Sequence, residues 1–281
     1  MSTQPAKPAA AKPAAPANNK KSGGIPAGVI LLILFAVAFC LFKFVMGDGS
    51  HFEGGTPEGH PIPGDYFGIV YKGGVIVPVL MTCFLTALTF SIERIITIGK
   101  AKGSGDVNAF VRKIQSLLDK DDTDAALKEC DKQKGTVGNV TLAAVKKYKQ
   151  LTTDGSLDKE QKLAALSKEV EEATSLELPM LEKNLTIIAT LASVSTLIGL
   201  LGTVVGMIKA FSALGNSGGS TDSSALANGI SEALVNTALG IGTSAICIIA
   251  YNFFTSKIDE LTYSVDEIGL SINQNYAAHH N

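Results

Sequence analysis

The chain has 281 residues, of which 46% are hydrophobic and 18% charged, and its mean hydropathy is +0.26. This composition is too apolar for an ordinary soluble protein of this length and indicates a membrane protein. The net charge of −2 gives no indication of a nucleic-acid partner. Because the sequence has no phosphate-binding loop, nucleophile–base pair or metal-ligand spacing, it predicts neither an enzyme nor a metal site.

The N-terminal region combines a polar tail with a first apolar run. Residues 1–24 are rich in Ala, Pro and Lys and predict a disordered cytoplasmic tail. The uncharged run that follows predicts a membrane helix at 25–46, although a cleaved signal peptide is the alternative because Lys20 and Lys21 precede it. The length of the polar segment and the absence of a small-residue cleavage site after the run favour a retained anchor.

Three further uncharged runs are long enough to cross a bilayer as helices, which takes roughly 20 apolar residues. Between them lie polar segments that are rich in Gly and Pro or carry many charges. The predicted order is a periplasmic loop at 47–72, a membrane helix at 73–97, a cytoplasmic helical domain at 98–184, a membrane helix at 185–211, a periplasmic loop at 212–226, a membrane helix at 227–254 and a helical cytoplasmic extension at 255–281.

The distribution of Lys and Arg predicts the orientation of these spans. The N-terminal tail carries four lysines and the segment 98–184 carries fifteen Lys or Arg residues. By contrast, 47–72 has only Lys72, and 212–226 has none. Because positively charged segments stay in the cytoplasm, both chain ends and the segment 98–184 are expected there.

Apolar residues at helical spacing predict short helices inside the cytoplasmic segment, at 107–118, at 124–133 with Thr123 as N-cap, and at 140–151. A longer helix is expected to begin at Ser156, which would cap it. Since a proline can kink a helix without ending it, that helix is expected to pass Pro179 and continue unbroken to about residue 211. The last span keeps its helical period past Lys257, so the membrane bundle should continue as a cytoplasmic bundle.

One face of the third span carries only small residues, which are Ser195, Gly199, Gly202 and Gly206. Thr203 lies beside this stripe. Close helix packing explains such a stripe without any transport role, with the Thr203 hydroxyl bonded to a carbonyl one turn earlier. A pore-lining face is the alternative.

The fourth span carries one carboxylate, Glu232, which directly precedes its uncharged run. Asn228 and Asn236 share its face, and Thr237 lies on the adjacent one. A charged side chain at mid-membrane costs about 2.5–3.5 kcal/mol on insertion scales, so such residues usually serve function. Glu232 could equally lie at the interface, where the helix dipole favours an anion. Its two asparagine neighbours favour a wet, inward-facing site.

A second charged motif, Glu93 followed by Arg94, ends the second span. We interpret this motif as an interfacial ion pair that anchors the helix at the membrane surface.

Two strings, IGLLGTVVGMIKAF at 198–211 and ISEALVNTALGIGTSAICIIAYNFF at 230–254, resemble the signature helices of the MotA/TolQ/ExbB proton-channel family. They are most similar to its ExbB/TolQ branch, in which the Glu-Arg pair is also usual. This chain departs from the pattern at Thr196, where the family often has Pro, and at Val205, where it often has an aromatic residue.

The resemblance implies an inner-membrane homopentamer of helices that conducts protons and uses no other cofactor. By motif match, the pore-lining residues of the family fall on Thr203, Glu232 and Thr237. It also implies three kinds of partner: membrane lipids, an ExbD/TolR-like single-span subunit with a transmembrane Asp, and a TonB/TolA-like protein that spans the periplasm. The expected role is to energise TonB-dependent transport. The alternatives are a TolQ-like envelope motor, a MotA-like motility stator and a scaffold that moves no ion.

Overall fold

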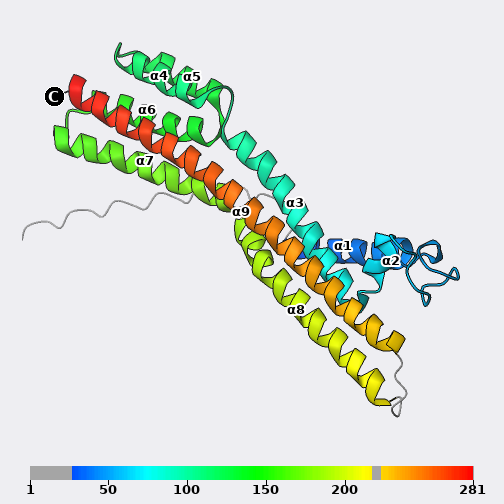
Figure 1. Cartoon of the computed structure of the whole chain (residues 1–281). Helices are drawn as coiled ribbons and strands as arrows, with labels where there is room; N and C mark the ends of the chain where they lie inside the picture. Colours follow the sequence, from blue (N-terminus) through cyan, green and yellow to red (C-terminus); the bar gives the residue numbers. More distant parts are fainter. Residues whose placement is uncertain (1–26, 217–222, 281) are drawn as a thin grey trace, which may run out of the picture.

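The computed structural model describes residues 27–216 and 223–280, and this part of the chain is all-α, as predicted (Figure 1). The predicted tail at 1–24 lies outside the described residues. The elements in chain order are α1 (Ala27–Cys40), η1 (Leu41–Met46), η2 (Gly49–His51), α2 (Tyr66–Tyr71), η3 (Gly74–Ile76), α3 (Val77–Ala101), α4 (Val107–Leu118), α5 (Thr123–Gln133), α6 (Gly135–Thr153), α7 (Lys159–Glu182), α8 (Leu185–Asn216) and α9 (Ser223–His279).

Four helical segments are long and apolar enough to cross a membrane, namely Ala27–Met46, Gly74–Ala101, Lys159–Gly215 and Ser224–His279. Many large apolar side chains on these helices are exposed; on α8 they include Leu197, Leu200 and Ile208. Such a surface would be a liability in water, whereas it suits contact with lipid or with other transmembrane helices. The chain is therefore a multi-pass membrane protein.

The long helix α9 organises the structure. Its first half packs along α8 and α3, and its second half packs against α4, α6 and α7 (Figure 1). At 1.5 Å per residue its 57 residues span about 85 Å. The helix therefore runs unbroken past Lys257, as the sequence predicts, and joins the membrane helices to a second bundle. We refer to α4–α7 with the second half of α9 as the α4–α7 bundle.

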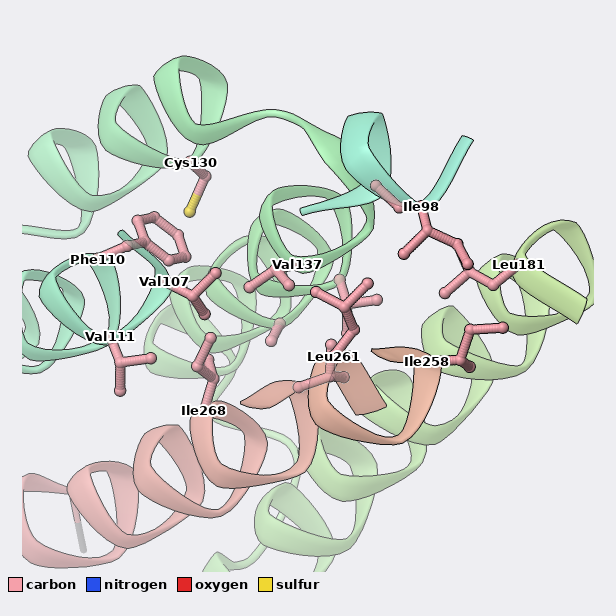
Figure 2. Packing of buried hydrophobic residues seen from close by; sticks show 14 of the residues in the cluster. Ile98, Val107, Phe110, Val111, Cys130, Val137, Leu181, Ile258, Leu261 and Ile268 are labelled. Carbon is pink, nitrogen blue, oxygen red and sulfur yellow. The ribbon is translucent and has the colours of Figure 1, made fainter. Parts of the chain in front are cut away.

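Apolar side chains from every helix of the α4–α7 bundle meet in one core. Figure 2 shows Val107 of α4 facing Ile268 of α9, with Phe110 of α4, Cys130 of α5 and Val137 of α6 beside them. The 3–4 spacing of the α4 residues places them on one face, which explains why an amphipathic helix forms at the predicted bounds. This core fixes the second half of α9, and through it the membrane half.

The predicted continuous helix to residue 211 is interrupted. Helix α7 contains Pro179 and ends at Glu182, and α8 begins at Leu185. Between them Asn184 has a φ of 67°, in the left-handed region that asparagine tolerates better than most residues. The expectation of one unbroken helix was therefore wrong, and the break lies after the proline rather than at it.

Two predicted helix caps also differ from the structure. The cap of α5 is Asp122, whose carboxylate accepts from the Ala125 amide at 2.9 Å, and not Thr123. The cap of α7 is Asp158, which forms a capping box with Gln161, and not Ser156. In both cases a carboxylate close to the predicted residue takes the position, because it complements the positive end of the helix dipole.

The segment between α1 and α3 is more regular than the irregular loop predicted for 47–72. The Phe42 ring stacks on Tyr71 at 4.7 Å, and Lys72 Nζ donates to the carbonyl oxygens of Pro57 and Glu58. The His51 ring nitrogen lies 2.7 Å from Asp65 Oδ2, and this hydrogen bond lowers the pKa of Asp65 below its usual value. The segment therefore forms a small folded unit that packs against the end of the first span.

The burial of Cys130 leads to a first testable prediction. This thiol is 2% exposed, and burial, followed by the charge of Asp131, raises its pKa to about 12. Because the thiolate is the reactive form, only about one thiol in 10⁴ is reactive at pH 8. In a variant with Cys40, Cys83 and Cys247 replaced by Ala, we expect maleimide to label Cys130 at least about 100-fold faster after denaturation. As a control, adding Ser116→Cys places an exposed thiol on the folded protein and should restore fast labelling. If Cys130 alone is labelled as fast in the folded protein as after denaturation, the described core is incorrect.

Candidate functional site

Helices α8 and α9 run antiparallel and pack closely along a seam of small residues (Figure 1). A Cβ atom at Gly199 would lie 2.9 Å from the carbonyl oxygen of Asn236, and one at Gly206 would lie 2.8 Å from that of Gly229. Gly202 faces the side chain of Asn236 in the same way. The small-residue stripe of the third span is therefore used for backbone contact, as the packing interpretation requires.

The structure brings two of the three predicted pathway residues into contact. The hydroxyls of Thr203 on α8 and Thr237 on α9 are hydrogen-bonded to each other across the seam. Thr203 Oγ1 also lies 3.3 Å from the carbonyl oxygen of Gly199 and 3.4 Å from that of Ala233. A shallow hollow of about 610 Å³ lies on α8 beside Thr203, lined mainly by apolar side chains such as Met207. The hydroxyl pair therefore borders a surface that a further helix could cover.

Glu232 does not contact the threonine pair and is bonded to Lys209 of α8 instead. Its side chain is 12% exposed and accepts a hydrogen bond from Lys209 Nζ at 2.5 Å. It also lies against Gly74, where a Cβ would be 2.9 Å from Glu232 Cδ and where φ is +77°. Glycine is needed at this position both for its backbone conformation and for the space that the carboxylate occupies. Glu232 is thus held between α8 and the entry to α3.

The geometry of α9 explains why Glu232 is separate from the threonine pair. Five residues separate Glu232 from Thr237, which turns the two side chains about 140° apart around the helix. Asn236 shares the face of Glu232, and its Nδ2 donates to the carbonyl oxygen of Gly73 at 2.8 Å. One face of α9 therefore contacts Gly73 and Gly74, just before α3, through Asn236 and Glu232, and these two side chains also contact α8. Thr237, on another face, contacts Thr203 of α8.

The remaining predicted site residues occupy varied positions. Asn228 is exposed on α9, one turn before Glu232. Ser195 is fully buried, and its hydroxyl has no hydrogen-bond partner among the described residues. The structure therefore gives Ser195 a place in the packed seam and leaves Asn228 on the surface.

Glu93 and Arg94 join α3 to the break between α7 and α8. Arg94 is 1% exposed, its Nε donates to Glu93 Oε2 at 2.7 Å, and its Nη1 donates to the carbonyl oxygens of Met180 and Leu181 at 3.1 and 2.8 Å. Asn184 Nδ2 donates to Glu93 Oε2 at 3.2 Å. Their placement at the membrane surface stays a prediction, whereas their observed contacts fasten the helix junction.

Lys209 is the residue of the site that the sequence interpretation missed. It is the only charged residue within α8, and Glu232 is the only one between residues 223 and 256. Two lone, opposite charges on antiparallel helices, at similar distances from the connection between them, are a signal for pairing. Lys209 lies near the end of the span predicted at 185–211, where it interrupts the uncharged run, so the pattern of that run gives it no role.

The region that contains this site is similar to a known protein family. A family model described as the MotA/TolQ/ExbB proton channel family matches residues 133–267. That range contains the Thr203–Thr237 contact, Lys209 and Glu232. Over residues 133–267 the chain is similar to this family. Within the MotA/TolQ/ExbB family, its similarities are to proteins of the ExbB and TolQ type.

Three relatives illustrate the extent of the similarity. A biopolymer transport protein, ExbB-like 3 of Synechocystis sp., is 38% identical over 109 residues, which are 38% of this chain and 49% of the relative. The Tol-Pal system protein TolQ of Pseudomonas aeruginosa is 26% identical over 202 residues, covering 69% and 84% of the two chains. The biopolymer transport protein ExbB of Helicobacter pylori is 43% identical over 82 residues, covering 29% and 56%. The chain thus spans about half the length of the two ExbB-type relatives and most of TolQ.

Proposed function

We propose that this chain is the channel subunit of an ExbB–ExbD-type complex in the inner membrane, which uses the proton motive force to energise TonB-dependent outer-membrane transport. The observation that carries the proposal is the hydroxyl pair of Thr203 and Thr237, formed across the α8–α9 seam inside the family region. Glu232 supplies a buried carboxylate about one and a half turns away on α9. Hydroxyls and a carboxylate are both groups that can donate or accept protons.

The proposed path uses the different chemistry of these groups. A threonine hydroxyl both donates and accepts a hydrogen bond, so the Thr203–Thr237 pair can accept a proton on one side and release one on the other. Glu232 tunes the local field or takes part in transfer. Protons are the coupling ion in this proposal, and no other cofactor is needed.

The proposed assembly places α8 and α9 around a central partner. The exposed apolar face of α8 and the hollow beside Thr203 support packing against further transmembrane helices. We place five copies of the chain around an ExbD/TolR-like subunit whose single span carries an Asp, with a TonB/TolA-like protein receiving the motion. The charge distribution supports cytoplasmic positions for both chain ends and for the α4–α7 bundle.

A TolQ-like role in envelope integrity is the second candidate. It is favoured by the long alignment with the Pseudomonas aeruginosa protein, which covers 84% of that relative. Expression in a host lacking ExbB or lacking TolQ separates the two roles, because recovery of iron-carrier uptake supports the first and recovery of detergent resistance supports the second. A MotA-like motility stator would restore neither.

The test of the channel itself uses Glu232→Gln and Thr237→Val. In vesicles that contain the chain with its single-span partner, a potassium diffusion potential should drive proton uptake, followed with an internal pH dye. We expect each substitution to lower the initial rate by about 10²-fold, the lower end of what a positioned proton-transfer group contributes.

Matched substitutions away from the site serve as controls. Thr190→Val removes an exposed hydroxyl on α8 that only donates to the Thr186 carbonyl at 2.7 Å. Glu182→Gln removes an exposed carboxylate at the end of α7. Both should keep the wild-type rate. If the two site variants assemble with the partner and still conduct protons normally, the scaffold alternative replaces the channel.

A further inference from the structure

Lys209 and Glu232 form an ion pair that is isolated from the other charges of the structure. Lys209 Nζ lies 2.5 Å from Glu232 Oε1, although each is the single charge of its apolar helix segment. The basic residue that precedes η3, Lys72, is bonded to carbonyl oxygens of its own segment. Glu93 and Arg94, further along α3, bond to each other. Lys209 is therefore the only cation paired with Glu232 among the described residues.

The face of α9 that carries Glu232 offers oxygens of the kind that bind cations. The Glu232 side chain is 12% exposed and lies against the Gly74 backbone. One turn along the same face, Asn236 is fully buried, and its Oδ1 has no hydrogen-bond partner among the described residues. Carboxylate, carbonyl and amide oxygens are the groups that bind small hard cations in proteins. The lysine ammonium occupies the place on the carboxylate that such a cation would take.

We propose that Lys209 is a tethered counter-ion that determines the ion specificity of Glu232. Its ammonium is a compact point charge, and a second cation on the same carboxylate would be repelled strongly at this distance in a poorly solvated site. A proton differs because it binds the carboxylate covalently and cancels the charge that holds the lysine. The Lys209 side chain is half exposed on a flexible stem, so it can then move away. The site thus exchanges protons and excludes Na⁺.

This inference rests on the proposed function only where it concerns proton flux; the exclusion of Na⁺ can be tested without flux. The full chain in detergent is unfolded by heat at pH 7, in NaCl or in choline chloride at the same concentration, and followed by circular dichroism. We expect the midpoint of the wild type to be the same in both salts. Lys209→Gln should unfold at least about 2 °C higher in NaCl, because Na⁺ can now bind the folded site.

Three further variants make the assignment specific. Lys209→Arg keeps the cation and should respond to Na⁺ as the wild type does. The double substitution Lys209→Gln with Glu232→Gln removes the carboxylate and should abolish the Na⁺ effect. Lys257→Gln removes an exposed lysine that pairs with Glu260 at 2.8 Å and should create no Na⁺ effect. Lys209→Met, which keeps the apolar stem, is the substitute if the Gln variant does not fold.

Two results would contradict the role proposed for Lys209. The proposal fails if neither Lys209→Gln nor Lys209→Met shows a Na⁺-specific shift, or if the shift persists without the Glu232 carboxylate. In the vesicle assay, external Na⁺ should slow proton uptake by Lys209→Gln several-fold and leave the wild type unchanged. If the wild type conducts no protons while the Na⁺-specific shift still appears in Lys209→Gln, the proposed channel function is wrong and the Lys209 assignment stands.

Discussion

Gly240→Leu is expected to prevent α8 and α9 from packing and so to prevent the chain from reaching its folded state. A Cβ atom at Gly240 would lie 2.6 Å from the carbonyl oxygen of Ser195 and 2.9 Å from Gly199 Cα. Both obstacles are backbone, so no side-chain rearrangement relieves them and the helices must separate. Overpacking of a close contact commonly costs about 1–3 kcal/mol, and a clash with backbone should cost at least about 3 kcal/mol.

A control for this substitution lies two residues away on the same helix. Gly242 has nothing within 4 Å of its Cβ position, so Gly242→Leu should leave the seam intact and gain helix propensity. Size-exclusion chromatography and thermal unfolding in detergent should separate the variants, with Gly240→Leu aggregated or much less stable. If both variants behave like the wild type, the close approach of α8 and α9 is incorrect.

Arg94→Ala is expected to destabilise the protein by about 1–3 kcal/mol, the cost of leaving a buried hydrogen-bonding group without its partner. The carbonyl oxygens of Met180 and Leu181 lie at the end of α7, where the helix itself supplies no donors. Without the guanidinium the buried Leu181 carbonyl stays unpaired, the partly buried Met180 carbonyl loses its donor, and Glu93 loses its cation. Arg94→Lys should recover only part of the stability, since an ammonium cannot match the fork of a guanidinium.

The matched control for Arg94 is the exposed Arg112 on α4. Its guanidinium reaches only the carbonyl oxygen of Asn108 at 3.4 Å, so Arg112→Ala should change stability by less than about 0.5 kcal/mol. Thermal unfolding followed by circular dichroism gives the comparison, because the chain has no tryptophan for fluorescence. Equal midpoints for the two alanine variants would contradict the role of Arg94 at the α7–α8 junction.

Much of the fold could be predicted because its signals are local. Long uncharged runs, helical periodicity and small-residue stripes each lie within one segment, and they gave the all-α class and the unbroken course of α9. The break after Glu182 could not be predicted in this way. It depends on Glu93 and Arg94, which are distant along the chain from the carbonyls and the Asn184 amide that they bind.

The same difference between local signals and contacts between distant segments applies to the candidate site. Thr203 and Thr237 were predicted together from their motifs, and the packing of α8 against α9 brings their hydroxyls into contact. The setting of Glu232 was not predicted, because Gly73 and Gly74 belong to another segment and contribute backbone atoms, which leave no motif. A charge count over the whole helix, rather than over its apolar run, would have found Lys209.

The two helices of the seam differ in their capacity to pass on a mechanical load. Helix α9 is unbroken, so a rotation imposed near Glu232 is transmitted as torsion to its C-terminal end. It has no break at which local bending could absorb the rotation. Helix α8 meets α7 at a joint at Asn184, which Arg94 and Glu93 brace from α3. If the contact between α8 and α9 twists, α9 transmits the torque to its C-terminal half. Helix α8 bends relative to α7 instead, so the strain would concentrate at Asn184.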